Sequence, residues 1–427
     1  MDNIKAKISR YYTSVFSISE FEGNKTLIWI VGALIFTIFI TIERWFREGV
    51  FTRSSTILER PNEGYLCWPH WTNCSDYYFF DLFPVSYTGN IFFVGLLCLI
   101  FLSYKFLYKK EYTKLHLMLL LLFCIKFFGV FFLSYKTAGN YDYYDLAFLF
   151  VVLFLSHKVF FLRLVFVLLY FIAAPLKFDE SWILAKYFST LKLGLPLFPE
   201  SLAPLFTNFV IFLQIIGTWL LLSSKNRIQS VAYLFFLLFH VYSGFLVGFR
   251  YLLTTIPILH LLFSEGNLPK FAFPKEKKVV FGILFVLSLF VSQVWVMTGF
   301  SADRKLTLEG NRYSLYMFEA NHQCVTNIAF RDPDGKEWTF SHSSHQAMRR
   351  CSPYTVWFFI ANQCKKYNNT IQVRWTYDHS VNGSPFYRIV DQNDSCKLDY
   401  KAFSRNEWIR DERLPEYIIG YPVKNDL

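Results

Sequence analysis

The sequence predicts an all-α polytopic membrane bundle of about eight or nine transmembrane helices, followed by a small exoplasmic α+β domain. Composition is the first reason: the 427 residues are 54% hydrophobic and only 18% charged, whereas about a quarter of the residues of a soluble domain are charged. The second is a series of nearly uncharged runs that approach or exceed ~18 residues, the length that crosses a bilayer. The third is the return of short polar and apolar alternations after Phe300.

Nine apolar runs are expected to cross the membrane. No small-residue cleavage site follows the first run, so we expect it to remain in the protein rather than to be removed as a signal peptide. Some runs are short, which leaves open that one pair is re-entrant. The predicted spans are 27–42, 90–108, 115–134, 143–157, 159–176, 202–222, 231–249, 251–264 and 279–298.

Positive charge predicts the orientation. The connections 105–114, 223–230 and 265–278 are rich in Lys and Arg and fall on the same side if nine spans are correct. Basic connections lie in the cytoplasm. An N-terminal tail, 1–26, is then cytoplasmic, and the transmembrane part, 27–300, carries an exoplasmic loop at 43–89. Because the formal charge of +11 is spread over these connections, we expect a lipid bilayer rather than nucleic acid as the partner.

Cysteine placement agrees with this orientation. Cys98 and Cys124 fall within apolar runs and are expected to be small buried hydrophobes. The other six lie in polar segments expected to face an oxidising compartment, which favours disulfides. Their pairing is left open, and no metal site is predicted. The six disulfide candidates are Cys67, Cys74, Cys324, Cys351, Cys364 and Cys396.

The last part, 301–427, alternates strand-like runs with turns. Asp334-Gly335 separates runs at 325–330 and 337–341, which is typical of a hairpin. A helix-like stretch at 345–367 precedes two more strand-like runs, 370–377 and 385–390. We therefore expect a small α+β domain.

The segment from Phe171 to Trp182 is the strongest candidate for chemistry. An apolar run with a proline ends there in Lys177, followed by Asp179 and Trp182. A desolvated lysine can act as a base near neutral pH. The alternative is that the Lys177 stem lies in lipid while its ammonium group reaches the interface.

Further polar residues interrupt the apolar runs. His240 and Lys126 lie within predicted spans, and Arg250 lies between two of them. A polar side chain in a span faces protein or a cavity more often than lipid. We expect Lys126 to form a polar contact between helices. Asn140 and Tyr141 begin a polar, aromatic cluster that also suits an interfacial belt.

These segments resemble the vitamin K-dependent γ-glutamyl carboxylase family and its bacterial relatives, which share the horizontally transferred transmembrane (HTTM) domain. The resemblance runs from about Asn140 to Asp391. The family motif small-Gly-x-x-Lys-x-Asp-x-x-Trp is matched by Lys177, Asp179 and Trp182, with Ala174 in place of the glycine.

The resemblance implies a membrane enzyme of the carbon-carbon lyase or carboxylase class. In that family the lysine deprotonates vitamin K hydroquinone, oxygenation creates a stronger base, and this base removes a γ-hydrogen of a peptide glutamate before CO2 adds, leaving the cofactor as an epoxide. Lys177 would be the base and His240 would orient the quinol by hydrogen bonding. The supporting residues implied are Asp179, Trp182, Asn140, Tyr141 and Arg250.

The sequence departs from the family at two further positions: the usual Asn-His reads Asn140-Tyr141, and the usual second lysine is Leu176. Two alternatives remain open: a non-catalytic HTTM-fold protein that binds or exports a peptide, and another quinone- or lipid-modifying reaction. The expected partners are the bilayer and an exoplasmic peptide or protein substrate. A bacterial inner membrane, a plasma membrane and the endoplasmic reticulum all fit.

Overall fold

The structure is a computed structural model that divides the chain into two compact units. Unit 1 comprises Met1–Thr52, Tyr77–Ala173 and Phe212–Val291, and unit 2 comprises Arg53–Asp76, Ala174–Ile211 and Ser292–Leu427. Segments far apart in the sequence therefore share a unit. The residues that the structure describes are 2–47, 66–74, 85–133, 135, 139–189, 194–247, 249–264, 271–315, 320–344 and 351–421.

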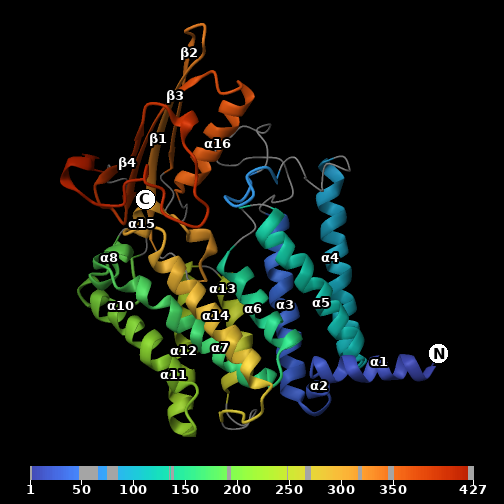
Figure 1. Ribbon diagram of the computed structural model, residues 1–427. Helices are drawn as coiled ribbons and strands as arrows, with labels where there is room; N and C mark the ends of the chain where they lie inside the picture. Colours follow the sequence, from blue (N-terminus) through green and yellow to red (C-terminus); the bar gives the residue numbers. More distant parts are fainter. Residues whose placement is uncertain are drawn as a thin grey trace. The chain divides into compact units, whose positions relative to one another are not determined.

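Helices make up unit 1 (Figure 1). α14 (Val279–Thr298) continues from it into unit 2. The other elements are α1 (Asp2–Val15), α2 (Glu20–Gly23), α3 (Lys25–Arg47), α4 (Val85–Tyr108), α5 (Tyr112–Phe128), the π-helix η3 (Gly129–Leu133), α6 (Asn140–Phe154), α7 (Lys158–Ala173), the π-helix η6 (Leu213–Gly217), α11 (Thr218–Leu220), α12 (Asn226–Val247) and α13 (Phe249–Phe263).

Seven helical stretches in the described chain are long and apolar enough to cross a membrane. α6 and α13 also form helices where spans were predicted, but each has 15 residues. At 1.5 Å per residue that is about 22 Å, which is short of a bilayer of ~30 Å. The seven stretches are Lys25–Phe46, Asn90–Tyr108, Tyr112–Phe132, Lys158–Lys177, Glu200–Leu220, Asn226–Leu246 and Val279–Thr298.

The long helices present apolar side chains outward. On α14, Val280, Leu284, Leu287 and Val291 recur at helical spacing and each is more than half exposed. Such a face suits hydrocarbon rather than water. Cys98 and Cys124 are exposed too, so their predicted burial is wrong. They occupy outward positions of α4 and α5, where a small apolar side chain is equally suited to lipid.

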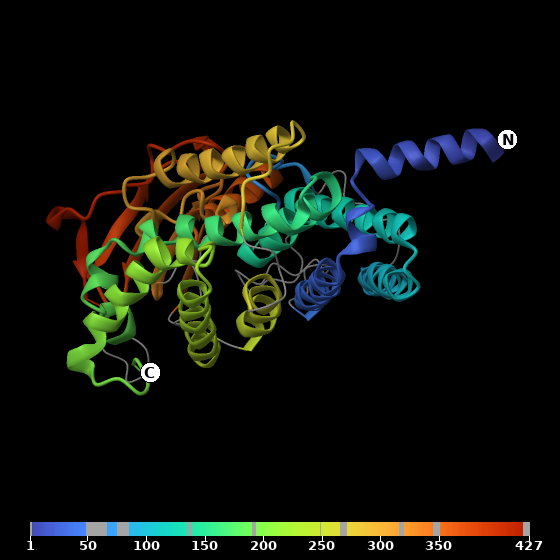
Figure 2. The ribbon, with the colours of Figure 1, turned by 90° about the horizontal axis from the view of Figure 1, so that it is seen from below.

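The predicted N-terminal tail is helical. α1 lies crosswise to α3 and α4, which Figure 2 shows nearly end-on. Tyr12 bonds to His116 of α5 at 2.7 Å, while the Glu20 carboxylate accepts the backbone N–H groups of His157 and Lys158. The N-terminal helices thus lie at the end of unit 1 where α5 and α7 begin.

Unit 2 contains an antiparallel sheet of the order β2-β1-β3-β4-β5. The predicted hairpin is confirmed, because β1 and β2 pair around a turn in which Gly335 N–H donates to the Asp332 carbonyl at 3.0 Å. Gly335 has φ +83°, a conformation that favours glycine. The strands are β1 (His322–Arg331), β2 (Glu337–Ser344), β3 (Gln372–Val381), β4 (Phe386–Gln392) and β5 (Ile418–Gly420).

One long helix, α16 (Pro353–Lys366), lies along the sheet (Figure 1). Phe359 packs against Phe330 and Phe340 of the hairpin strands. The predicted helix at 345–367 is confirmed from Pro353 onward, and 345–350 lie outside the described residues. The shorter elements of unit 2 are η4 (Pro175–Lys177), α8 (Glu180–Ile183), α9 (Lys186–Ser189), η5 (Glu200–Leu202), α10 (Ala203–Phe212), α15 (Arg304–Thr307), η7 (Asn311–Tyr313), η8 (Ser395–Lys397) and η9 (Pro415–Tyr417).

All six disulfide candidates are paired, and the pairs lie in unit 2. Two disulfides secure the ends of α16, and the third closes a short loop whose Cys67 carbonyl accepts a hydrogen bond from Tyr354 of that helix at 2.6 Å. The helix, the loop and the sheet are thus joined covalently and by hydrogen bonding. The pairs are Cys67–Cys74, Cys324–Cys351 and Cys364–Cys396.

Candidate functional site

The Lys177 segment follows the end of α7. Pro175 occupies the first position of the 3-10 helix η4, and Lys177 N–H donates to the Ala174 carbonyl at 2.9 Å. Proline cannot donate a backbone hydrogen bond, so an α-helix rarely continues through it. The Lys177 side chain is only 3% exposed, and Ala174 is fully buried. The predicted Lys177 side chain is therefore buried within unit 2.

Asp179 orients the next turn. Its Oδ1 accepts the backbone N–H groups of Ser181 at 2.8 Å and Trp182 at 3.2 Å. This is a helix N-cap, which satisfies N–H groups that have no partner within the helix. Its second oxygen pairs with the ammonium of Lys305. The Asp-x-x-Trp spacing thus begins α8 and fixes Trp182 at its first turn.

One aromatic ring lies against the Lys177 side chain, and two more rings pack against that one. Its Nζ lies 5.1 Å from the centre of a Trp182 ring, within the range of a cation–π contact. The Trp182 indole donates to the Thr207 carbonyl at 3.0 Å. Tyr187 and Phe188 pack against the same indole, with ring centres 5.8 and 5.4 Å away. We call Trp182, Tyr187 and Phe188 the aromatic wall.

Hydrogen bonds connect this segment to the sheet. The Ser181 hydroxyl accepts from Asn382 Nδ2 at 2.8 Å. Asn321 and Asn382 exchange two further bonds of 2.8 Å, one of them from Asn321 N–H to Asn382 Oδ1. Asn321 Nδ2 also donates to the Tyr187 carbonyl at 3.2 Å. These residues precede β1 and follow β3, so the end of the sheet supports α8 and α9.

A buried histidine pair completes the network. His322 Nδ1 lies 3.0 Å from His379 Nε2, and both residues are fully buried. His379 Nδ1 bonds to the Leu306 carbonyl, so this nitrogen carries the proton. Burial lowers the pKa of His379 to about 4, and the neutral ring accepts from His322 through Nε2. Leu306 follows Lys305, the partner of Asp179, so hydrogen bonds and short stretches of backbone lead from the histidine pair back to Asp179.

The other predicted site residues lie in unit 1. His240 on α12 is fully buried and hydrogen-bonded to the Tyr170 hydroxyl of α7. Asn140 and Tyr141 form the first turn of α6. Arg250 belongs to α13, and its side chain lies outside the described residues. The structure thus brings Lys177, Asp179 and Trp182 together within unit 2.

A second polar cluster links three helices of unit 1. Lys126 of α5 pairs with Asp142 at 3.0 Å and with Asp145 at 2.9 Å, and Arg44 of α3 pairs with Asp142 at 2.6 Å. Thr41 donates to Asp145 at 2.8 Å. These five residues form the ionic cluster. The predicted contact of Lys126 between helices is confirmed.

Sequence reasoning missed several members of both clusters. Lys305, Asn321 and His322 lie more than a hundred residues from Lys177, and no local pattern joins them to it. Asn382 lies between the predicted strand-like runs 370–377 and 385–390. The Asp142 and Asp145 pair offered a usable signal, because two carboxylates three positions apart lie on one face of a helix.

Among the residues that the structure describes, no group of three or more His, Cys, Asp or Glu side chains is arranged to hold a metal ion. Comparisons with protein-family models, with curated proteins and with solved structures find no match to this chain.

Proposed function

We propose that the chain is a multi-pass membrane protein that crosses the bilayer nine times, with its disulfide-bonded part on the oxidising side. Seven apolar helices and three disulfides support this. The N-terminal helices support counting α6 as a span, because they contact the starts of both α5 and α7. If α6 did not cross, α7 would begin at the opposite end of unit 1.

We further propose that the chain is an enzyme of the vitamin K-dependent carboxylase type, with Lys177 as the base. One observation carries the proposal: a nearly fully buried lysine lies against the aromatic wall and directly beside an anchored Asp-x-x-Trp turn. The alternative, in which the Lys177 stem lies in lipid and its ammonium group reaches water, does not explain a lysine that is only 3% exposed.

The residues present fit a hydroquinone. The Lys177 amine could accept a hydroxyl proton, and the buried aromatic wall gives its surroundings the apolar character that suits a fused ring system. When bound, the hydroquinone would react with O2 and supply a base strong enough to remove a γ-hydrogen of glutamate, so that CO2 can add to that carbon. The cofactor would leave as the epoxide, together with water.

The surroundings of Lys177 suit proton uptake. The Trp182 ring stabilises the ammonium that forms when the amine takes a proton. Asp179, the nearest carboxylate in sequence, is already paired with Lys305. The network of Ser181 and Asn382 fixes the backbone that carries both residues. His240 is bonded to Tyr170 within unit 1, and its role in orienting the quinol rests on the family resemblance alone.

The test compares Lys177→Met with Lys186→Met in membranes that contain the full-length protein. Lys186 is an exposed neighbour paired with Glu180 and serves as the matched control. Membranes receive vitamin K hydroquinone, O2, labelled CO2 and a glutamate-containing peptide. We expect fixed label and epoxide from the wild type and Lys186→Met, and a loss of about 10²- to 10⁴-fold in Lys177→Met, the usual contribution of a general base.

Two outcomes would contradict the proposal. No label and no epoxide from the wild type, where a known carboxylase works, excludes the carboxylase reaction. Full activity of Lys177→Met excludes Lys177 as the base.

A non-catalytic peptide-binding protein of the same fold is the second candidate. One observation favours it: the polar groups of the network already have hydrogen-bond or ion-pair partners within the protein, as groups with a structural role do. The pairs are Asp179–Lys305, Asn321–Asn382 and His322–His379. A binder would retain a peptide equally well as wild type and as Lys177→Met, and neither would consume the hydroquinone.

A further inference from the structure

Sequons for N-linked glycosylation, Asn-x-Ser or Asn-x-Thr, occur in both units of the protein. Such a motif carries a glycan only where its asparagine reaches the surface of an exoplasmic segment. The burial of each asparagine therefore separates the sequons that can be modified from those that arise by chance. The five asparagines are Asn24, Asn73, Asn368, Asn382 and Asn393.

The sequon of Asn368 lies in an exposed turn at the end of α16. Asn368, Asn369 and Thr370 are all exposed. The backbone N–H of Asn368 donates to the Lys365 carbonyl at 3.1 Å, and that of Thr370 donates to the Tyr367 carbonyl at 3.0 Å. The side-chain amide of Asn368 makes no hydrogen bond to any residue that the structure describes. Both the acceptor nitrogen and the third residue of the motif are therefore accessible in the folded unit.

The sequon of Asn393 lies in the loop that follows β4. Asn393 is exposed, and its amide forms no hydrogen bond within the described part of the chain. Its third residue, Ser395, is only 2% exposed. Because the motif requires a hydroxyl at this position, Asn393 has to be modified before Ser395 becomes buried. The glycan would then remain on an exposed loop.

One disulfide links the two exposed sequons. The Cys364–Cys396 bond joins the end of α16 to η8. Asn368 follows Cys364 by four residues, and Asn393 precedes Cys396 by three. Disulfides form in the lumen of the endoplasmic reticulum and in other oxidising compartments, and N-linked glycans are transferred on the same side of the membrane. The two asparagines therefore flank a bond that itself indicates the exoplasmic side.

Asn382 is a sequon whose side chain is already used by the fold. It is 6% exposed, and its Nδ2, the atom that would carry a glycan, donates to the Ser181 hydroxyl at 2.8 Å. A glycan on this atom would displace Ser181, so the folded unit requires Asn382 to be unmodified. Asn73 is exposed, but its Ser75 lies outside the described residues, and we assign nothing to that sequon.

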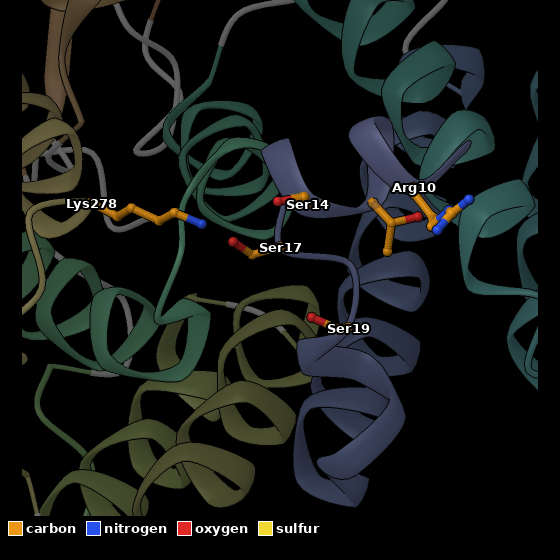
Figure 3. Close-up of a pocket in the computed structure, with 6 residues that line it drawn as sticks. Arg10, Ser14, Ser17, Ser19 and Lys278 are labelled. Atoms are coloured by element: carbon orange, nitrogen blue, oxygen red, sulfur yellow. The ribbon is translucent and has the colours of Figure 1, made fainter. Parts of the chain in front are cut away.

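Asn24 lies in a basic part of unit 1. Its Oδ1 accepts the backbone N–H of Leu27 at 3.0 Å, at the start of α3. At the end of unit 1 where the N-terminal helices lie, Arg10 of α1 and Lys278 line an open pocket (Figure 3). Basic residues concentrate on the cytoplasmic side of a membrane protein, where N-linked glycans are not transferred. We therefore expect Asn24 to remain unmodified.

We propose that Asn368 and Asn393 carry N-linked glycans, transferred by a membrane oligosaccharyltransferase from an oligosaccharide on a polyisoprenyl diphosphate. The asparagine amide nitrogen bonds to the anomeric carbon of the first sugar, while the bond from that carbon to the diphosphate breaks. The nitrogen loses one proton, and the lipid diphosphate leaves with the electron pair of the broken bond. The inference rests on the membrane orientation proposed above and is independent of the carboxylase reaction.

The experiment uses the full-length protein from the membranes of the cells that make it. A peptide N-glycosidase removes each glycan and converts the modified asparagine to aspartate, which peptide mass spectrometry detects. We expect conversion at Asn368 and Asn393 and none at Asn24 or Asn382. In the same cells, Asn368→Gln and Asn393→Gln should each remove one glycan from the intact protein. The matched control, Asn24→Gln, changes the same residue type in another sequon and should leave both glycans in place.

The outcomes separate the glycans from the orientation. Absence of conversion at either site would overturn that site, and conversion at Asn24 or Asn382 would overturn the choice of sequons by burial and orientation. An unreduced digest of the same sample tests the Cys364–Cys396 disulfide. If this disulfide is present and the glycans are not, the orientation stands and the glycosylation proposal fails. Free thiols at both cysteines would contradict the orientation, and both sites with it.

Discussion

The two units bury their ionisable groups in different ways. In unit 1, Lys126 and Arg44 meet Asp142 and Asp145 directly, so opposite charges compensate one another. In unit 2, Asp179 is also paired with a cation, Lys305, but the network continues from it through the uncharged side chains of Ser181 and Asn382 to the histidine pair. The first arrangement joins three helices mainly through ion pairs, whereas the second combines an ion pair with hydrogen bonds between uncharged side chains. Buried charge alone is therefore a poor guide to chemistry.

Removal of Lys126 should give the largest effect. Lys126→Met leaves the carboxylates of Asp142 and Asp145 buried without their shared cation, which we expect to cost about 3–5 kcal/mol of unfolding free energy. Thermal unfolding in detergent measures the loss. Lys105→Met, an exposed change on α4, is the control and should be nearly silent. If both variants unfold alike, the ionic cluster does not stabilise unit 1.

The buried carboxyl group of Glu309 should titrate at an unusually high pH. Glu309 is 1% exposed and accepts two hydrogen bonds from Asn406, and burial raises its pKa from 4.5 to about 7. The folded state then holds a proton that the unfolded state has lost, so stability falls as pH rises from 4.5 to 7, by roughly 3 kcal/mol in all.

Glu309→Gln should remove this dependence. It would make the protein more stable than wild type at pH 8 and not at pH 4.5, as measured by denaturant unfolding at both values. The lowered pKa of His379, about 4, has the opposite effect: the free energy of unfolding of the protein falls as pH falls from 6.5 to 4. The difference between wild type and variant isolates Glu309, and equal pH profiles would contradict its protonation.

Substitution of Asp179 should lower the free energy of unfolding by a smaller amount, part of it from the helix cap and part from the ion pair. Asp179→Ala loses both the helix cap and the pair with Lys305, for a total of about 2 kcal/mol, whereas Asp179→Asn keeps the cap and loses about 1 kcal/mol. The unfolding midpoints of both variants measure this. Identical losses would mean that the cap contributes nothing and that only the charge matters.

The sequence predicts most of the elements but not their assembly. Apolar runs and the Asp334-Gly335 turn identified the long helices and the hairpin because these signals are local. The helical N-terminus was missed because its polar and aromatic residues gain stability from contacts such as Tyr12–His116. Lys177 could be singled out as a charge after an apolar run, but Lys305 and Asn321 could not, since only the folded sheet brings them near it.

The hydrogen-bond network around Asp179 has a consequence for biosynthesis. Ser181 meets Asn382, a residue 201 positions later in the chain. At the usual rates of 5–20 residues per second the ribosome adds that length in about 10 to 40 s. The Lys177 turn leaves the ribosome well before its support exists. A nascent or truncated chain would therefore carry the lysine without the framework that holds it, and the site would be completed only after the last strands have paired.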